Sequence, residues 1–128
     1  ARSALIAADD ALREAKRRKE SLEHALKQDV GEDLRWFSLV GNCSKKRLKD
    51  YDYSICFFKE ATQGYTRLGR FDRWETEDPP VMVFSNGEHC HAGPARNLRV
   101  RFVCGPLQEL LSVMEPARCV YEAEVQHP

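Results

Sequence analysis

The pattern of apolar and polar positions changes its period once along the chain, close to residue 30. Over the first 28 residues, apolar or small residues recur at alternating steps of four and three, which is a seven-residue repeat with a narrow seam. Only Lys19 interrupts the seam, no proline does, and Gly31 stands where a helix would end. The pattern predicts a helix from residue 1 to about residue 28, roughly 40 Å long. The seam positions are Ala1, Leu5, Ala8, Leu12, Ala15, Lys19, Leu22 and Leu26.

Two interpretations of this helix are open. In the first, it is a solvated helix that lies on its own domain, with charged residues such as Arg13, Lys16 and Glu20 facing water. In the second, it is one strand of a coiled coil, because the alanines of the seam allow close approach of a partner helix. We favour the second interpretation and treat residues 1–30 as a coiled-coil stem, although the sequence does not identify its partner.

From about Leu34 onward, apolar and polar residues alternate, which is typical of half-buried strands. In residues 97–104 the alternation places Leu98, Val100 and Phe102 on one face. Residues 50–57, 81–84 and 119–125 also have strand character. The turn signals that separate such segments are Asp78-Pro79-Pro80, Ser85-Asn86-Gly87, Gly93-Pro94 and Gly105-Pro106. Short strands at this spacing predict a mainly β domain over residues 34–128, an antiparallel β-sandwich or flattened barrel.

Two local features of this domain refine the prediction. The Ser85-Asn86-Gly87 sequence favours a tight hairpin, because Asn and Gly accept positive φ at little cost. The stretch from Leu107 to Met114 is compatible with either a helical turn or a strand, and that alternative stays open.

Charge and hydropathy exclude two classes of partner. Twenty basic residues balance twenty acidic residues, so no net field attracts the chain to nucleic acid or to an anionic membrane surface. The apolar runs are only a few residues long, which excludes a membrane-spanning helix. We therefore expect neither nucleic acid nor a membrane as a partner.

Five cysteines lie in the last two-thirds of the chain, at positions 43, 56, 90, 104 and 119. In a β-patterned segment, this clustering favours a disulfide framework over buried thiols. The odd number requires either one free thiol or a partner beyond Pro128. We favour the partner beyond Pro128.

Four polar residues are spread through the β segment, each close to a cysteine. They supply an amide, a guanidinium, a carboxylate and a phenol, which together donate to and accept from several neighbouring hydroxyls. This is the inventory needed to hold one sugar ring. The alternative is that Arg96 and Glu115 form a structural ion pair and that Gln63 is an ordinary surface residue. The four residues are Gln63, Arg96, Glu115 and Tyr121.

The motifs around these residues resemble those of a known lectin family. They occur in the same order and at similar separations in the mannose 6-phosphate receptor homology (MRH) domain, in the version carried by beta subunits of glucosidase II. The seven-residue repeat resembles the coiled-coil stretch before that domain. The motifs are Leu39-x-Gly41-x-Cys43, Tyr51-x-Tyr53-x-x-Cys56-x-Phe58-Lys59, Gln63, Cys90-x-x-Gly93-Pro94-x-Arg96, Val103-Cys104-Gly105 and Glu115-Pro116-x-Arg118-Cys119-x-Tyr121.

The resemblance implies a site and a disulfide pattern. Mannose would be held by the four residues Gln63, Arg96, Glu115 and Tyr121. Cys43 would pair with Cys56 and Cys90 with Cys119, which leaves Cys104 unpaired within this chain. His91 stands where the family has a tryptophan that flanks the sugar, and Phe57 stands where a proline follows the cysteine.

The resemblance also implies partners and a location. The ligands would be high-mannose N-glycans with terminal mannose, and the full-length protein would associate with the catalytic alpha subunit of glucosidase II in the lumen of the endoplasmic reticulum. The module would recognise glycans and perform no catalysis. The alternatives are another MRH lectin of that compartment, acting in glycoprotein quality control or degradation, and a purely structural module.

Metal and hydrolase chemistry are not expected. His89-Cys90-His91 suggests zinc, but alternation along a strand would direct both histidines to the face opposite Cys90, and no second cluster has suitable spacing. A glycosidase needs two carboxylates about 5–9.5 Å apart. Glu115 is the only acid tied to the motif set. We therefore predict no metal, no cofactor and no catalytic residue.

Overall fold

The computed structural model describes residues 2–28, 30–31, 35–77 and 80–128. The chain divides into two compact units, residues 1–40 and residues 41–128, and each is described by itself. Leu34, where the predicted β domain begins, lies outside the described residues, as do Asp78 and Pro79 of one predicted turn.

The first unit consists of α1 (Arg2–Lys27) and a short 3-10 helix, η2 (Phe37–Leu39). α1 confirms the helix predicted from the seven-residue repeat. Its seam leucines are exposed, including Leu5 at 69% and Leu26 at 54%. After α1, the backbone N–H of Trp36 donates to the carbonyl of Val30 at 2.8 Å. Among the described residues, no helix combines the length and apolar character that crossing a membrane requires.

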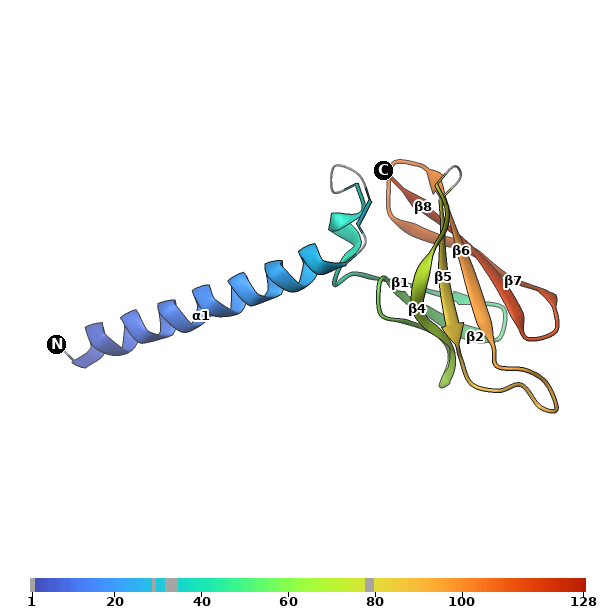
Figure 1. Cartoon of the computed structure of the whole chain (residues 1–128), viewed down its shortest axis with the longest axis horizontal. Coiled ribbons are helices and arrows are strands. Elements are labelled where there is room, and N and C mark those ends of the chain that lie inside the picture. The colour runs from blue at the N-terminus through green and yellow to red at the C-terminus, as the bar shows by residue number, and fades with distance from the viewer. Residues whose placement is uncertain (1, 29, 32–34, 78–79) are drawn as a thin grey trace. The chain divides into compact units, whose positions relative to one another are not determined.

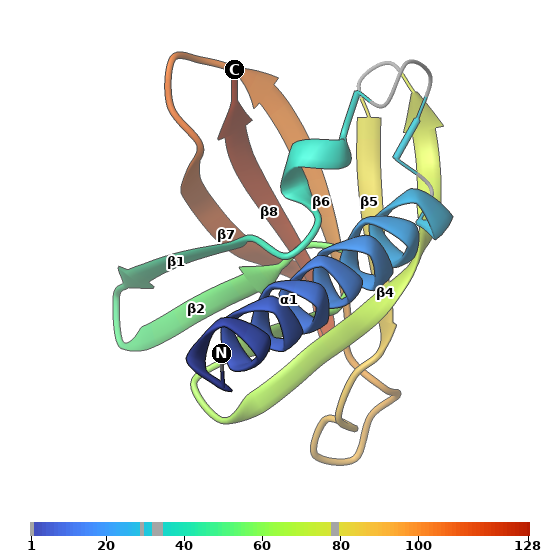
Figure 2. The ribbon, with the colours of Figure 1, turned by 90° about the vertical axis from the view of Figure 1, so that its left-hand side faces the viewer.

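The second unit is one sheet of eight strands (Figures 1 and 2). The order of the strands across the sheet is β1-β2-β3-β4-β5-β6-β8-β7. The strands are β1 (Cys43–Leu48), β2 (Tyr51–Cys56), β3 (Glu60–Gln63), β4 (Thr66–Glu77), β5 (Pro80–Asn86), β6 (Asn97–Cys104), β7 (Glu109–Ala117) and β8 (Val120–His127).

The sheet is antiparallel with one exception that the sequence did not predict. β8 pairs with β6 in parallel, in register from Asn97 opposite Val120 to Cys104 opposite His127. The reason is the path of the chain, because β7 lies at the outer edge and β8 returns between β7 and β6. The stretch from residue 107 to 114, left open by the sequence, belongs largely to strand β7.

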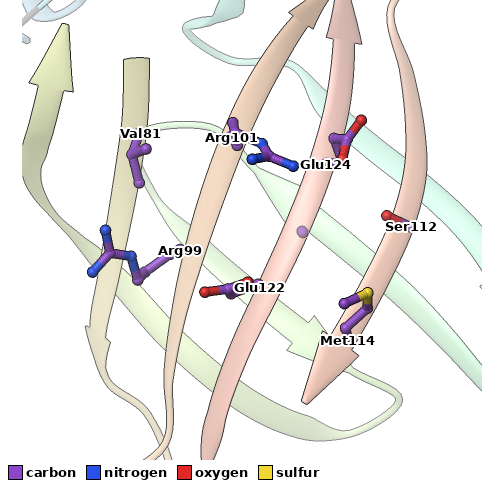
Figure 3. Close-up of a pocket in the computed structure, with 8 residues that line it drawn as sticks. Val81, Arg99, Arg101, Ser112, Met114, Glu122 and Glu124 are labelled. Atoms are coloured by element: carbon purple, nitrogen blue, oxygen red, sulfur yellow. Dashed lines mark hydrogen bonds and ion pairs between the residues drawn. The ribbon is translucent and has the colours of Figure 1, made fainter. Parts of the chain in front are cut away.

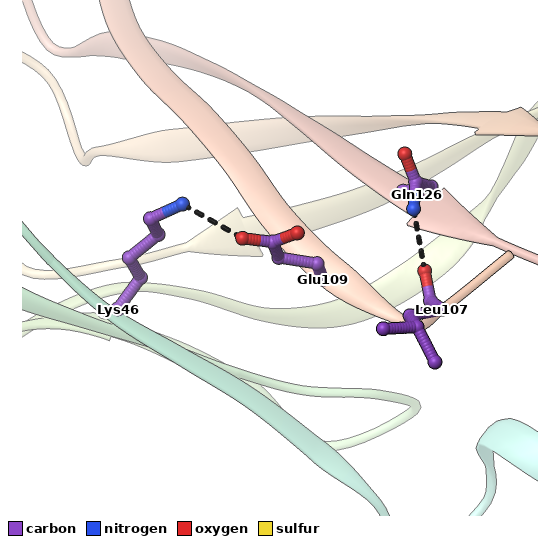
Figure 4. A network of polar contacts seen from close by, with 4 residues as sticks. All are labelled: Lys46, Leu107, Glu109 and Gln126. Carbon is purple, nitrogen blue, oxygen red and sulfur yellow. Dashed lines mark hydrogen bonds and ion pairs between the residues drawn. The ribbon is translucent and has the colours of Figure 1, made fainter. Parts of the chain in front are cut away.

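The two edges of the sheet approach each other, so the sheet nearly closes into the predicted flattened barrel. The Nζ of Lys46 on β1 lies 3.0 Å from Oε1 of Glu109 on β7 (Figure 4). Beside this pair, the amide of Gln108 donates to the buried hydroxyl of Ser44 at 3.3 Å. Side chains therefore bridge the gap between strands that share no backbone ladder.

The inner face of the sheet forms an apolar core. The predicted alternation in β6 is confirmed, since Leu98, Val100 and Phe102 are each at most 5% exposed. Phe57 is 1% exposed and its ring centroid lies 5.9 Å from that of Phe102. The residue that replaces the family proline therefore joins the core.

The predicted tight hairpin at Ser85-Asn86-Gly87 is wrong. Asn86 has the expected positive φ of 56°, yet the chain does not reverse there. Glu88 continues to pair with β4, its N–H donating to the carbonyl of Arg67 at 2.9 Å. Gly87 permits this continuation, because a Cβ there would lie 2.3 Å from the carbonyl oxygen of Leu68. The reversal comes later, in a loop over residues 87–96 that we call the 87–96 loop.

Candidate functional site

The inner face of the sheet changes from apolar to polar at one end of the β unit. Arg96 lies directly before β6, two residues ahead of the buried Leu98. On β3, Gln63 lies two residues after the buried Ala61. Because side chains two apart on a strand share a face, both polar groups continue the apolar inner face. Tyr121 is the register partner of Leu98 and belongs to the same face.

Backbone pairing and hydrogen bonds connect the residues at this polar end from one strand to the next. Gln63 pairs with Thr66, and the next residue, Arg67, accepts a hydrogen bond from Glu88. The N–H of Arg96 then donates to Glu88 at 3.0 Å.

From there the ladder reaches the last two strands. The N–H of Asn97 donates to the carbonyl of Cys119 at 3.1 Å, and Val120 pairs with Ala117 at the turn that follows Glu115. The four residues predicted from the sequence therefore lie at the same end of the sheet, the end that carries the 87–96 loop, opposite the C terminus in Figure 2. We call this set, Gln63, Arg96, Glu115 and Tyr121, the polar rim.

Gln63 is held from the side by a tyrosine. Its Nε2 donates to the hydroxyl of Tyr53 at 2.9 Å, and the two residues are register partners on β2 and β3. Gly64 follows at a φ of 58°, which suits the first position of a two-residue hairpin turn. The amide nitrogen of Gln63 is thus oriented, and its oxygen is available to accept from a ligand hydroxyl.

Arg96 is oriented by the 87–96 loop. Its Nη1 donates to the carbonyl oxygens of Glu88 and His89, at 3.2 and 3.0 Å. Its Nε is buried without a hydrogen-bond partner in the described part of the chain. A guanidinium has five N–H donors, so the two carbonyls use only one side of the group. The arginine is half-buried and positioned, with donors left over.

Glu115 stands at the turn between β7 and β8. Its Oε2 accepts the backbone N–H of Cys119 at 3.0 Å, while the side chain remains exposed. Cys119 itself has a φ of 70°, a conformation that costs energy for a residue other than glycine. The carboxylate helps to hold this turn and still has lone pairs for hydroxyl donors.

Tyr121 is the most buried of the four residues, at 5% exposed. It pairs with the buried Leu98 on the inner face, so little of its ring is open to solvent. The ring is part of the floor beneath the rim.

The ion-pair alternative for Arg96 and Glu115 is wrong. Within the described residues neither side chain takes part in an ion pair, and each bonds to the backbone instead. The expectation that His89 and His91 lie on a strand is also wrong. Both belong to the 87–96 loop, where a single isolated bridge joins His89 to Ala95. No group of three or more metal-ligating side chains was found among the described residues.

The structure contains the two predicted disulfides. Cys43 and Cys56 are directly opposite each other on β1 and β2. Cys90 and Cys119 join the 87–96 loop to the turn between β7 and β8. Cys104 at the end of β6 is exposed and outside both disulfides.

A separate pocket of about 230 Å³ lies on the outer face of β5, β6, β8 and β7 (Figure 3). Its two arginines are already paired, Arg101 with Glu124 at 3.0 Å and Arg99 with Glu75 at 2.7 Å. None of the rim residues lines it. We therefore assign the candidate site to the polar rim and not to this pocket.

Sequence reasoning missed two residues that shape the rim, Tyr53 and Arg118. Tyr53 bonds to Gln63, and Arg118 Nη2 donates to the carbonyl of His91. Both are members of the motifs, but the motifs assign neither of them a role at the site. The register between β2 and β3 would have been needed to find the first, and the path of the 87–96 loop to find the second.

Comparison with known proteins gives consistent matches. Residues 3–128 match the family model described as "Glucosidase II beta subunit-like protein". The "Glucosidase 2 subunit beta" of Oryza sativa subsp. indica is 40% identical over 112 residues, which cover 84% of this chain and 18% of that protein. The human protein of the same name is 30% identical over 109 residues, covering 78% of this chain and 21% of that protein. The chain thus spans about a fifth of the length of these curated relatives.

The fold agrees with the sequence comparison. The crystal structure of the MRH domain of glucosidase II beta bound to mannose matches with a TM-score of 0.66 and 30% identity, and the match covers 71% of this chain and 94% of that domain. With the strands, both disulfides and the polar rim in place, this chain belongs to the glucosidase II beta subunit-like family.

Proposed function

We propose that residues 41–128 form a lectin module that binds terminal mannose at the polar rim. The observation that carries the proposal is the way in which the Arg96 guanidinium is held. Two loop carbonyls hold one side of its guanidinium, next to groups that accept hydrogen bonds from hydroxyls. The similarity to a domain solved with mannose bound supports the choice of sugar.

Each rim residue has a separate role in this proposal. Arg96 donates to ring hydroxyls through the part of its fork that the loop does not use, and it cannot accept. Glu115 accepts from two adjacent hydroxyls in charge-assisted bonds. Gln63 accepts through its oxygen, because Tyr53 takes a hydrogen bond from its nitrogen. Tyr121 contributes its hydroxyl end above a buried ring.

The position of the hydroxyls sets the specificity. Mannose differs from glucose in its axial 2-hydroxyl, which would lie between the Gln63 amide and the Arg96 guanidinium. A group built to bond this hydroxyl loses that bond when the hydroxyl is equatorial. We expect mannose to bind with an affinity on the order of millimolar, because one small ring offers few buried contacts against the cost of association.

In the full-length protein, we propose a non-catalytic subunit that acts in the lumen of the endoplasmic reticulum. The module would bind high-mannose N-glycans and bring them to the catalytic alpha subunit. Tethering through one glycan arm raises the effective concentration of another arm at the catalytic site. The exposed leucine seam of α1 supports a coiled-coil role for residues 1–30.

The test is calorimetric or glycan-array binding of mannose to the parent chain and to Arg96→Lys. An ammonium cannot reproduce the fork, and losing one charged hydrogen bond costs about 1.5–3 kcal/mol, enough to put a millimolar ligand below detection. The fold should persist, because the substitution removes the buried, unpartnered Nε.

The matched control is Arg101→Lys, on the outer face of β6, the strand that Arg96 precedes, where its exposed pair with Glu124 contributes little. This control should bind mannose like the parent. Equal binding by Arg96→Lys would refute the assigned site. A parent that binds no glycan at all would instead support the structural-module alternative.

A further inference from the structure

The 87–96 loop is held by two arginines, Arg96 at its own end and Arg118 in the turn between β7 and β8. Arg96 donates to the carbonyls of Glu88 and His89, and Arg118 Nη2 donates to the carbonyl of His91. We propose that Arg118 is a positioning residue of the mannose site, which fixes the loop that orients Arg96 without touching the sugar. This inference rests on the proposed function of the polar rim.

The loop needs such support because it has little secondary structure. Near its ends, backbone bonds join Gly87 to Arg96 and Arg96 to Glu88, and beyond them the described residues show one isolated bridge, His89 to Ala95. The chain reverses over residues 91–93, where Ala92 has a φ of 55°. Backbone hydrogen bonds close the reversal, from Gly93 to the carbonyl of Cys90 at 3.2 Å and from Cys90 to Pro94 at 3.1 Å.

Arg118 lies next to the disulfide that anchors the same loop. Cys119 follows it in the chain and is bonded to Cys90, which precedes His91. The chain from Cys90 to His91, the hydrogen bond between His91 and Arg118, the chain from Arg118 to Cys119 and the disulfide back to Cys90 therefore form a small closed ring. The disulfide ties the loop to this turn at one residue, and the hydrogen bond from Arg118 adds a second tie at the neighbouring residue.

The chain packs closely around this ring at Gly93. A Cβ on Gly93 would lie 3.0 Å from Sγ of Cys119, 3.2 Å from Cβ of Cys90 and 3.8 Å from Nε of Arg118. Arg118 thus lies over the reversal on the side of the disulfide. Its charge has no carboxylate partner among the described residues, so the carbonyl of His91 is its recorded anchor.

The consequence for the site follows from the Arg96 contacts. Glu88 and His89 lie on the near side of Cys90 and hold one side of the Arg96 guanidinium, while His91 lies on its far side. If the loop rotates about Cys90, those two carbonyls move and Arg96 loses its orientation. Arg118 therefore acts on mannose affinity through backbone atoms of the loop.

The experiment compares Arg118→Ala, Arg118→Lys and the control Arg101→Ala, all in the whole chain. Mannose binding and hydrogen exchange of the sugar-free protein are measured for each. We expect Arg118→Ala to bind mannose about tenfold more weakly, the effect of losing one charged hydrogen bond. Its amides at residues 88–93 should exchange faster while the sheet is unchanged. Arg118→Lys should recover part of both properties, and Arg101→Ala should match the parent.

Three outcomes would overturn the proposal. Unchanged mannose affinity in Arg118→Ala would show that the loop does not need this tie. Weaker affinity with unchanged exchange would mean that Arg118 contacts the sugar directly. Faster exchange throughout the sheet would make it a general stabiliser of the fold. If the parent binds no mannose, the proposed function fails, and the exchange measurement alone then tests whether Arg118 fixes the 87–96 loop.

Discussion

The deep end and the rim of the same inner face are held together in different ways. On β6, Val100 is fully buried in the apolar core, while Arg96 lies half-buried just before the strand begins. On β7, Leu110 is 1% exposed and Glu115, near the end of the strand, is exposed. Alternation places Arg96 on the face of Val100, and the register shift between Leu110 and Ser112 brings Glu115 to the face of Leu110.

The difference is that the deep end depends on side-chain packing and the rim depends on bonds to backbone atoms. Arg96, Glu115 and Arg118 all reach carbonyl or amide groups of the 87–96 loop or the adjoining turn. Packing determines whether the unit folds, whereas the backbone bonds determine where the hydroxyl-binding groups point. Stability and mannose affinity should therefore respond to different substitutions.

The largest effect should come from the disulfides. Replacing Cys90 and Cys119 together by serine should cost about 3.5 kcal/mol of stability and the Cys43–Cys56 pair about 3 kcal/mol, from their sequence separations of 29 and 13. Mannose binding should vanish only in the first double variant, because Cys43 and Cys56 lie in a ladder that already fixes their strands. Chemical denaturation and calorimetry check both parts. Loss of binding in both double variants would remove the distinction between the two regions.

The next effect tests the deep end alone. Leu110→Ala should lower the free energy of unfolding by about 3 kcal/mol, since it empties space in the core. Leu110 is at the opposite end of β7 from Glu115, so the folded fraction should bind mannose with the affinity of the parent. Urea denaturation gives the stability, and titration at low temperature gives the affinity. An affinity that falls along with the stability would contradict the separation.

The smallest effect should come from His91→Ala. The imidazole is exposed, and the recorded contact of this residue is made by its backbone carbonyl, which alanine keeps. Stability should change by no more than about 0.5 kcal/mol, as for most surface substitutions. Mannose affinity should fall by less than about threefold, which is at the low end of the loss expected for one neutral hydrogen bond. A tenfold loss in calorimetry would place the imidazole against the sugar and extend the rim to this side chain.

Local periodicity in the sequence predicted the helix and the strands, but it could not predict which distant strands pair. The seven-residue repeat gave α1, and the alternation of Leu98, Val100 and Phe102 gave the inner face of β6. The parallel pairing of β8 with β6 and the bridging of β1 to β7 depend on where distant segments meet, which spacing does not encode.

The candidate site follows from residue type and from the family resemblance, whereas its geometry does not. Gln63, Arg96 and Glu115 have the hydrogen-bonding groups that a sugar needs, and they occur at one rim. Arg118 was not chosen, because its partner is a backbone carbonyl. Every residue has such a carbonyl, so the identity of His91 carries no signal for the contact.

The position of β8 has a consequence for the order in which the unit can assemble. β1 to β6 pair in the order in which a ribosome makes them, but β7, the next strand, has no place beside β6. One edge of β6 stays unpaired until β8 arrives, and that strand also brings Tyr121 and the half-cystine Cys119. Contacts between distant segments slow folding, and an open edge exposes the nascent chain to wrong partners. If Cys90 is oxidised before Cys119 has been synthesised, it can form a disulfide only with a cysteine that precedes Cys119 in the chain. The timing of disulfide formation should therefore govern the yield of folded protein.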